Sequence, residues 1–225
     1  MKTLSFHNYS IGYKKNEILI ELNSQQDEVS FKSGLNLIAA PNGFGKTAFL
    51  QTLSGIIPAL KGDVVDDGKQ LDIEKDILYV SEYLSFPKYI YPQEWVDFLS
   101  QKYKKEELKK WVKKFDLEIG FEHFLGKMSQ GERRKVTWLA AHFSKKPIIL
   151  LDEPFDGLDI LAIESAREML NIWKQEERVV IIVGHQVGDF LDLMDEVFFI
   201  FDKKFHSMKG LNHANYRNKL LSIYK

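Results

Sequence analysis

The sequence predicts an α/β protein with a largely parallel sheet. Short apolar runs alternate with helical stretches along most of its 225 residues, and this alternation is typical of strand–helix–strand units. Before residue 34, three apolar runs follow one another with too little chain between them for helices, which indicates a small antiparallel layer. Residues 87–143 are rich in aromatic residues and lysine and read as helical. We therefore expect a core domain formed by 1–86 and 144–225, carrying the antiparallel layer, with an inserted helical subdomain at 87–143.

Each expected element follows from its own pattern. Strands are expected at the apolar runs 4–6, 18–22, 29–31, 35–40, 63–67, 77–80, 148–151, 179–183 and 197–201. Helices are expected where apolar residues recur on one face, as Leu108, Trp111, Val112 and Phe115 do. These helices are predicted at 46–53, 106–115, 131–143 and 161–173.

Composition excludes several classes of function. The 31 Lys and Arg residues nearly balance the 32 Asp and Glu residues, so the net charge of -1 gives no general attraction to nucleic acid, and no nucleic acid partner is expected. No Cys is present, which excludes disulfides, thiolate metal sites and Cys nucleophiles. The start, MKTLSFHNYS, has no apolar segment of a signal peptide, and the apolar runs are far shorter than the ~18 residues of a membrane-spanning helix.

The strongest local signal lies between a predicted strand and a predicted helix. It reads Ala40-Pro41-Asn42-Gly43-Phe44-Gly45-Lys46-Thr47, followed by Ala48. In this context the pattern is that of a P-loop, whose backbone N–H groups and helix N-terminus bind phosphate. Lys46 would contact the β- and γ-phosphates, and the Thr47 hydroxyl would bind Mg²⁺. The opening residue is Ala40 where the motif normally has Gly, which weakens the match without excluding it.

A pair of carboxylates ends another buried strand, Ile148 to Leu151. Asp152 and Glu153 follow at the edge of the predicted parallel sheet, where ligands usually bind. With the P-loop, they point to nucleotide hydrolysis: Asp152 would support Mg²⁺, and Glu153 would polarise the attacking water. The alternative is that both residues merely end a strand and begin a turn.

With these motifs and one more, nearly the whole chain resembles the ATP-binding cassette family. The segment Met128-Ser129-Gln130-Gly131-Glu132 resembles the family signature Leu-Ser-Gly-Gly-Gln. The resemblance implies that Ser129 and Gly131 reach the γ-phosphate of ATP bound to a second nucleotide-binding subunit, as part of a homo- or heterodimer. It also implies that Asp156-Gly157-Leu158-Asp159 is the loop that crosses this dimer.

Three further positions take roles from the same resemblance. His185 matches the switch histidine that contacts the γ-phosphate, and Tyr13 matches the aromatic residue that stacks on adenine. Glu82 stands where the family has a Gln that senses Mg²⁺, so its charge puts the Gln role in doubt. For Tyr13 the alternative is a core aromatic, for Glu82 a surface carboxylate.

Two basic clusters can be explained either by a binding role or by simple exposure to solvent. Arg133, Arg134 and Lys135 could help to hold phosphate across the dimer, but a solvated first helical turn is the commoner reading. The lysines of 102–114 form a basic face that could lie near anionic lipid, or simply face solvent.

The sequence thus predicts an ATP-binding and ATP-hydrolysing subunit of an ABC transporter, using ATP and Mg²⁺. Its expected partner is a separate transmembrane permease subunit, so that the chain is cytoplasmic, peripheral on the inner face of the membrane, and contacts the membrane only indirectly. The short chain leans weakly toward export of peptide, lipid or drug. The main alternative is a soluble ABC-type ATPase without a membrane partner. A nucleotide kinase or GTPase is disfavoured because it has no use for the signature segment.

Overall fold

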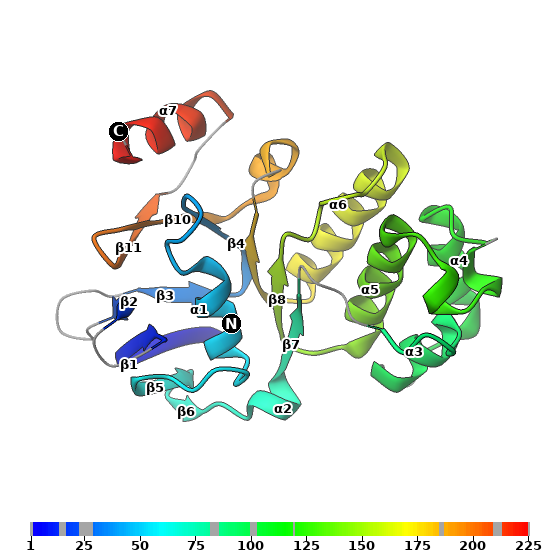
Figure 1. Ribbon diagram of the computed structural model, residues 1–225, viewed down its shortest axis with the longest axis horizontal. Helices are drawn as coiled ribbons and strands as arrows, with labels where there is room; N and C mark the ends of the chain where they lie inside the picture. Colours follow the sequence, from blue (N-terminus) through cyan, green and yellow to red (C-terminus); the bar gives the residue numbers. More distant parts are fainter. Residues whose placement is uncertain are drawn as a thin grey trace.

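The structure, a computed structural model, contains two sheets with helices around them (Figure 1). It describes residues 2–13, 17–22, 29–81, 86–99, 103–118, 120–184, 187–208 and 213–224. Among these residues, no helix has the length and the apolar character needed to span a membrane.

The larger sheet is mostly parallel and lies at the centre of the molecule. In spatial order its strands are β11 (Lys204–Met208), β10 (Glu196–Phe201), β4 (Gly34–Ala39), β9 (Val179–Val183), β8 (Ile148–Asp152) and β7 (Ile77–Val80). Alternate residues of each strand enter different cores: Ile149 and Leu151 pack toward one side, Ile148 and Leu150 toward the other. Burial on both faces explains why these strands read as continuous apolar runs.

The second sheet is antiparallel and forms the predicted layer beside the parallel sheet. Its strands lie in the order β2 (Ile18–Leu22), β1 (Thr3–Gly12), β5 (Lys61–Asp66) and β6 (Lys69–Gln70), and β3 (Ser30–Lys32) also pairs with β1. Its apolar side chains share one core with α1 (Lys46–Leu53) and one face of the parallel sheet. The predicted α/β class and the antiparallel layer are therefore confirmed.

Most remaining helices lie on the other side of the parallel sheet (Figure 1). They are α3 (Pro92–Leu99), α4 (Lys105–Lys114), α5 (Gln130–Ser144) and α6 (Ile160–Gln175), with 3-10 turns at Gly120–Glu122, Leu125–Lys127 and Gly188–Leu193. Short α2 (Ile73–Asp76) leads into β7, and α7 (His213–Tyr224) ends the described chain. The described part of 87–143 is largely helical, as expected, and includes α3; β6, β11, α2 and α7 were not predicted. The division into core and inserted subdomain stays a prediction.

A buried histidine in α5 makes stability depend on pH. His142 is 2% exposed, and its Nδ1 accepts the Trp173 Nε1–H at 3.2 Å. Burial, followed by the nearby Lys145 and Arg178, lowers the pKa of His142 to about 3, so the folded protein holds it neutral. The unfolded chain takes up this proton below pH ~6.5, whereas the folded protein does not.

The free energy of unfolding should therefore fall as the pH is lowered through the window from about 6.5 to 5, with up to ~1.4 kcal/mol per pH unit from this group. Urea unfolding of wild type and His142→Phe at several pH values measures the difference in slope. Four carboxylates have pKa values lowered from values that are already acidic, so they titrate below this window. They are Glu132, Asp159, Glu176 and Asp192. Equal slopes for the two proteins would contradict the assignment.

Candidate active site

The loop between β4 and α1 has the backbone shape of a phosphate-binding loop. Gly43 and Gly45 adopt left-handed φ angles of 85° and 86°, which L-residues with a Cβ rarely adopt. A Cβ on Gly45 would also lie 3.1 Å from the Cβ of Leu19. Both glycines are therefore required by local geometry, and α1 begins directly after the second of them, so that its N-terminus opens on the loop.

Lys46 is the first residue of α1 and its side chain is held under the loop. Its Nζ donates to the carbonyl oxygens of Ala40 at 2.7 Å and Pro41 at 3.1 Å. Lys46 is 7% exposed, and this burial lowers its pKa, while the charges of Glu153 and Asp152 act in the opposite direction. The two carboxylates thus help to keep the ammonium group charged in a position that faces the loop.

Thr47 and Asp152 meet across the sheet edge. The Thr47 hydroxyl donates to Oδ1 of Asp152 at 3.2 Å, and the Tyr79 hydroxyl donates to Oδ2 at 3.0 Å. Asp152 ends β8 and is 1% exposed. Burial, then the charge of Asp152, raises the pKa of Tyr79, so the phenol remains a hydrogen-bond donor. Sequence analysis missed Tyr79, although its place near the end of the neighbouring strand β7 could have suggested it.

Glu153 adopts a left-handed conformation, which is rare for this residue type. Its φ is 47°, and its backbone N–H donates to Val183 O at 2.9 Å. The side chain lies against Gly184, where an added Cβ would be 3.0 Å from Oε2. Strained backbone of this kind is found preferentially at functional sites. The geometry fixes the carboxylate at the end of β8, beside Asp152.

Several of these groups line a hollow of about 450 Å³. Its walls include Asn42, Gly43, Gly45, Lys46, Thr47 and Ala48 of the loop and helix, Glu153 and Asp156 after β8, and Tyr13 and Leu19 from the antiparallel layer. Tyr13 is 66% exposed, so it is not the core residue that was the alternative. The size is in the ordinary range of small-molecule sites, ~300–1,000 Å³. The structure thus brings together, at one hollow, the residues from Tyr13 to Ala48 that were predicted to bind nucleotide, with Glu153.

The chemistry of the hollow fits a nucleotide with Mg²⁺. Hard cations prefer oxygen ligands, and Mg²⁺ takes only one or two from protein when phosphates and water supply the others. Thr47 and Asp152 offer such oxygens within hydrogen-bond distance of each other. No cluster of three or more His, Cys, Asp or Glu residues suited to a metal occurs within the described ranges.

The signature segment lies apart from this hollow. Ser129 caps α5: its hydroxyl accepts the Glu132 N–H at 3.2 Å, and the Glu132 carboxylate accepts the Ser129 N–H at 2.7 Å. These hydrogen bonds are the main reason why the pKa of Glu132 is lowered. Gly131 is packed closely, because a Cβ there would lie 2.7 Å from Gly157 O. Neither Ser129 nor Gly131 lines the hollow of its own chain.

Two of the three basic residues after the signature segment differ from both expectations, whereas Arg133 is half-exposed. Arg134 and Lys135 are 1% and 5% exposed, so they form no solvated turn. Arg134 donates to Ser81 O at 3.2 Å, and Lys135 pairs with Asp159 at 2.6 Å. They are bound within their own chain rather than presented to a partner's phosphate. The sequence could not distinguish these cations, because the contacts join segments far apart in the chain.

The same helix also contacts the segment after β8. The Trp138 indole N–H donates to Pro154 O at 3.1 Å, and its ring stacks on Trp173 of α6. Together with Lys135 and Asp159, this contact fixes the signature helix to both ends of the 153–159 loop. Glu82 and His185, predicted for metal sensing and γ-phosphate contact, lie outside the described residues.

The fold and the loop at the start of α1 define a P-loop nucleotide-binding protein. The family model described as ABC transporter matches residues 28–156, more than half of the chain, and the chain belongs to this family. Because the family couples transport to ATP hydrolysis, the protein is an ATP-hydrolysing enzyme. It is an ATP-binding subunit of the ABC transporter type.

Curated relatives and solved structures agree with this membership. The aliphatic sulfonates import ATP-binding protein SsuB of Bacillus thuringiensis subsp. konkukian is 28% identical, with 90% of this chain and 82% of the relative covered. The manganese transport system ATP-binding protein MntB of Bacillus subtilis is 26% identical, with 91% and 85% covered. A solved ATP-binding subunit of an ABC transporter has a TM-score of 0.79 at 20% identity, with 96% and 93% covered; at this identity it supports the fold alone.

Proposed function

We propose that this chain binds ATP and Mg²⁺ at the hollow beside α1 and hydrolyses ATP to power import through a separate membrane subunit. The observation that carries the proposal is the hydrogen bond between Thr47 and Asp152. It lies at the N-terminus of α1, where Lys46 and Glu153 also line the hollow. A hydroxyl, a buried carboxylate and a cation within one hollow are the groups that phosphoryl transfer needs.

Each group has one task in the proposed reaction. The backbone of Asn42 to Gly45 and the start of α1 would bind the phosphates, and Tyr13 would stack on adenine at the open side. Thr47 and Asp152 would hold Mg²⁺, which when bound neutralises charge on the β- and γ-phosphates. Glu153 would orient water and accept its proton, since its carboxylate is held at the hollow by an unusual backbone conformation.

The exposed start of α5 supports a dimer. Ser129 is exposed and does not line the hollow of its own chain, while its helix N-terminus carries the positive end of the helix dipole. A second nucleotide-binding subunit facing this one would bring that terminus to the γ-phosphate. The rigid attachment of α5 through Lys135 and Trp138 would keep the terminus aligned with the loop after β8.

An exposed aromatic surface before and within α3 supports a membrane partner. Tyr89 and Phe98 are 82% and 78% exposed, and Tyr91 is 41% exposed. Tyr89 and Tyr91 contact Phe124, and Phe98 stacks on Trp95, so two groups of rings lie before and within α3. Apolar surfaces of this kind mark protein–protein contacts. We infer that it receives a cytoplasmic segment of the permease, which would place the chain on the inner face of the membrane.

The relatives support one direction of transport. Those named above act on aliphatic sulfonates or manganese, the former by import, and the molybdate/tungstate import ATP-binding protein WtpC of Pyrococcus abyssi is 26% identical over 72% of this chain. The expected lean toward export finds no support among them. We therefore propose import, with the cargo chosen by the membrane subunit rather than by this chain.

Reconstitution with a candidate multi-span permease tests the proposal. We expect the tagged chain to co-purify with this multi-span protein from detergent-solubilised membranes. In proteoliposomes that enclose the chain and ATP, labelled cargo should accumulate inside, on the side of ATP. Phe98→Asp should reduce co-purification severalfold, whereas Phe201→Asp, a change at an exposed ring of β10, should not. Cargo leaving the lumen would contradict import, and an ATPase that never associates with membranes would favour the soluble alternative.

A further inference from the structure

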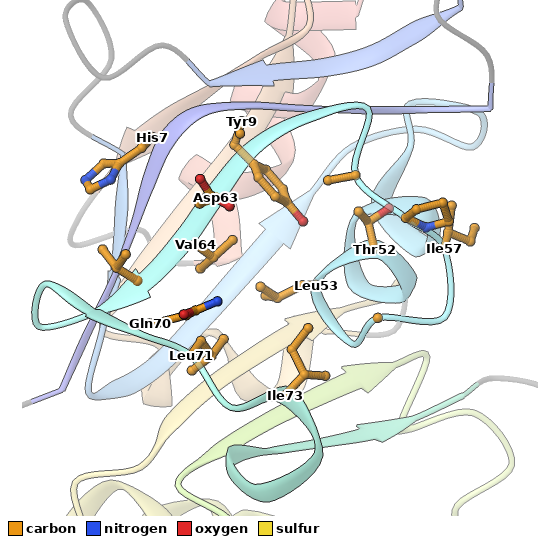
Figure 2. Close-up of a pocket in the computed structure, with 15 residues that line it drawn as sticks. His7, Tyr9, Thr52, Leu53, Ile57, Asp63, Val64, Gln70, Leu71 and Ile73 are labelled. Atoms are coloured by element: carbon orange, nitrogen blue, oxygen red, sulfur yellow. The ribbon is translucent and has the colours of Figure 1, made fainter.

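A second hollow, of about 510 Å³, lies between the antiparallel sheet and the C-terminal end of α1. Figure 2 shows its walls: β1 and β5 on one side, the end of α1 on the other, and the chain around Leu71 and Ile73 along the third. It shares no lining residue with the hollow beside the P-loop. The function proposed above makes no use of it.

A β-bulge turns one tyrosine into this hollow. In the β1·β5 pairing, His7 is opposite Asp63 and Ser10 is opposite Lys61, so β1 has one residue more than β5 between these pairs. Asn8 lies in the bulge, where its φ of 48° is left-handed. The bulge shifts the alternation of side chains, so that Tyr9 joins Phe6 on the buried face.

The Tyr9 hydroxyl has no hydrogen-bond partner among the described residues and can donate its proton to a ligand. Tyr9 is 4% exposed, and its ring extends across the hollow toward the end of α1 that carries Thr52 and Leu53 (Figure 2). Its phenol oxygen makes no hydrogen bond with the residues that the structure describes, and burial raises its pKa, so it remains a neutral O–H. Because Tyr9 lines the open hollow, a ligand acceptor placed there can accept this O–H.

The remaining lining defines the chemistry of a ligand. Leu53, Val64, Leu71 and Ile73 provide apolar surface, and the Thr52 hydroxyl, which donates to Ala48 O at 2.7 Å, keeps lone pairs for a donor. Asp63 is the acidic residue of the lining, and no Lys or Arg belongs to it. Its one basic side chain is the imidazole of His7, so the hollow has no permanent cation to bind phosphate or carboxylate groups, and it suits an uncharged molecule.

We propose that this hollow is a binding site for a neutral, mainly apolar small molecule whose carbonyl or amide oxygen accepts the Tyr9 hydroxyl. The apolar body of the ligand lies against Leu53, Val64 and Ile73. The site is separate from the nucleotide site, and it does not depend on ATP binding or on a permease.

Benzamide and benzoate form a matched pair of probes, because they share a ring and differ in charge. We expect benzamide, titrated into the isolated protein and followed by two-dimensional NMR, to shift the signals of Leu53, Val64 and Ile73. Benzoate should bind at least about tenfold more weakly, because its carboxylate would lose hydration without a cationic partner. Equal binding of the two probes, or no saturable binding of benzamide, would overturn the proposal.

Substitution of the tyrosine tests the contact itself. Tyr9→Phe keeps the ring and removes the hydroxyl, so benzamide affinity should fall about threefold to tenfold. Tyr216→Phe, at a ring of α7 outside the hollow, should leave the affinity unchanged. Thermal unfolding of both variants checks that they fold. Wild-type affinity in a folded Tyr9→Phe protein would exclude the hydrogen bond and with it the proposed site.

Discussion

Glu153→Gln should reduce ATP hydrolysis by about 10²- to 10⁴-fold while leaving ATP binding nearly intact. General-base catalysis contributes this much in typical enzymes, and an amide cannot take the proton of the attacking water. Glutamine has almost the same shape, so the left-handed turn at φ 47° and the contact with Gly184 should persist. Phosphate release measures the turnover, and calorimetry with ATP measures the binding.

The same variant reports on the dimer. If a second subunit completes each site, ATP that is bound and not hydrolysed should keep two subunits together, and light scattering should show a dimer that depends on ATP. Glu177→Gln is the matched control, because Glu177 is an exposed glutamate that also has a positive φ, 53°. We expect it to hydrolyse ATP at the wild-type rate. Undiminished turnover in Glu153→Gln would disprove the general-base assignment.

The local motifs of the site could be predicted from sequence because each one is contiguous. The glycines at 43 and 45 and the lysine after them lie between a strand and a helix, and the structure places them as that order predicts. The pair Asp152–Glu153 ends a buried strand. Parallel strands present their carboxyl ends at one edge of a sheet, so the meeting of Thr47 with Asp152 follows from the fold class.

Contacts between distant segments could not be predicted in this way. Arg134 and Lys135 read as a solvated basic turn, because three consecutive cations beside a helix start usually face water. Their burial depends on Ser81 and Asp159, whose positions are fixed only when β7, α5 and α6 have packed together. The Asn8 bulge is similar: it is defined by the register between β1 and β5, and a single strand does not reveal it. Periodicity thus predicts elements, whereas the partners of charged side chains depend on the assembled fold.

Replacement of Lys46 should have the second large effect, on nucleotide affinity. Lys46→Met keeps most of the length and the apolar body of the side chain and removes the ammonium group, with its charge and its N–H donors. Hydrogen bonds that involve a charged group contribute ~1.5–3 kcal/mol, so ATP affinity should fall about tenfold to more than a hundredfold. The loss should be smaller for AMP, which lacks the β- and γ-phosphates that the ammonium group is expected to contact. Calorimetry with ATP and with AMP measures both affinities.

Stability has to be separated from binding in this experiment. The Lys46 ammonium donates to the carbonyl oxygens of Ala40 and Pro41, and its substitution leaves both without this donor. The protein therefore loses some stability, which thermal unfolding without nucleotide measures. Lys69→Met, an exposed lysine of β6, controls for the loss of one positive charge. If Lys46→Met is folded at the temperature of the titration and binds ATP as tightly as Lys69→Met does, the ammonium group does not hold phosphate and the nucleotide must bind elsewhere.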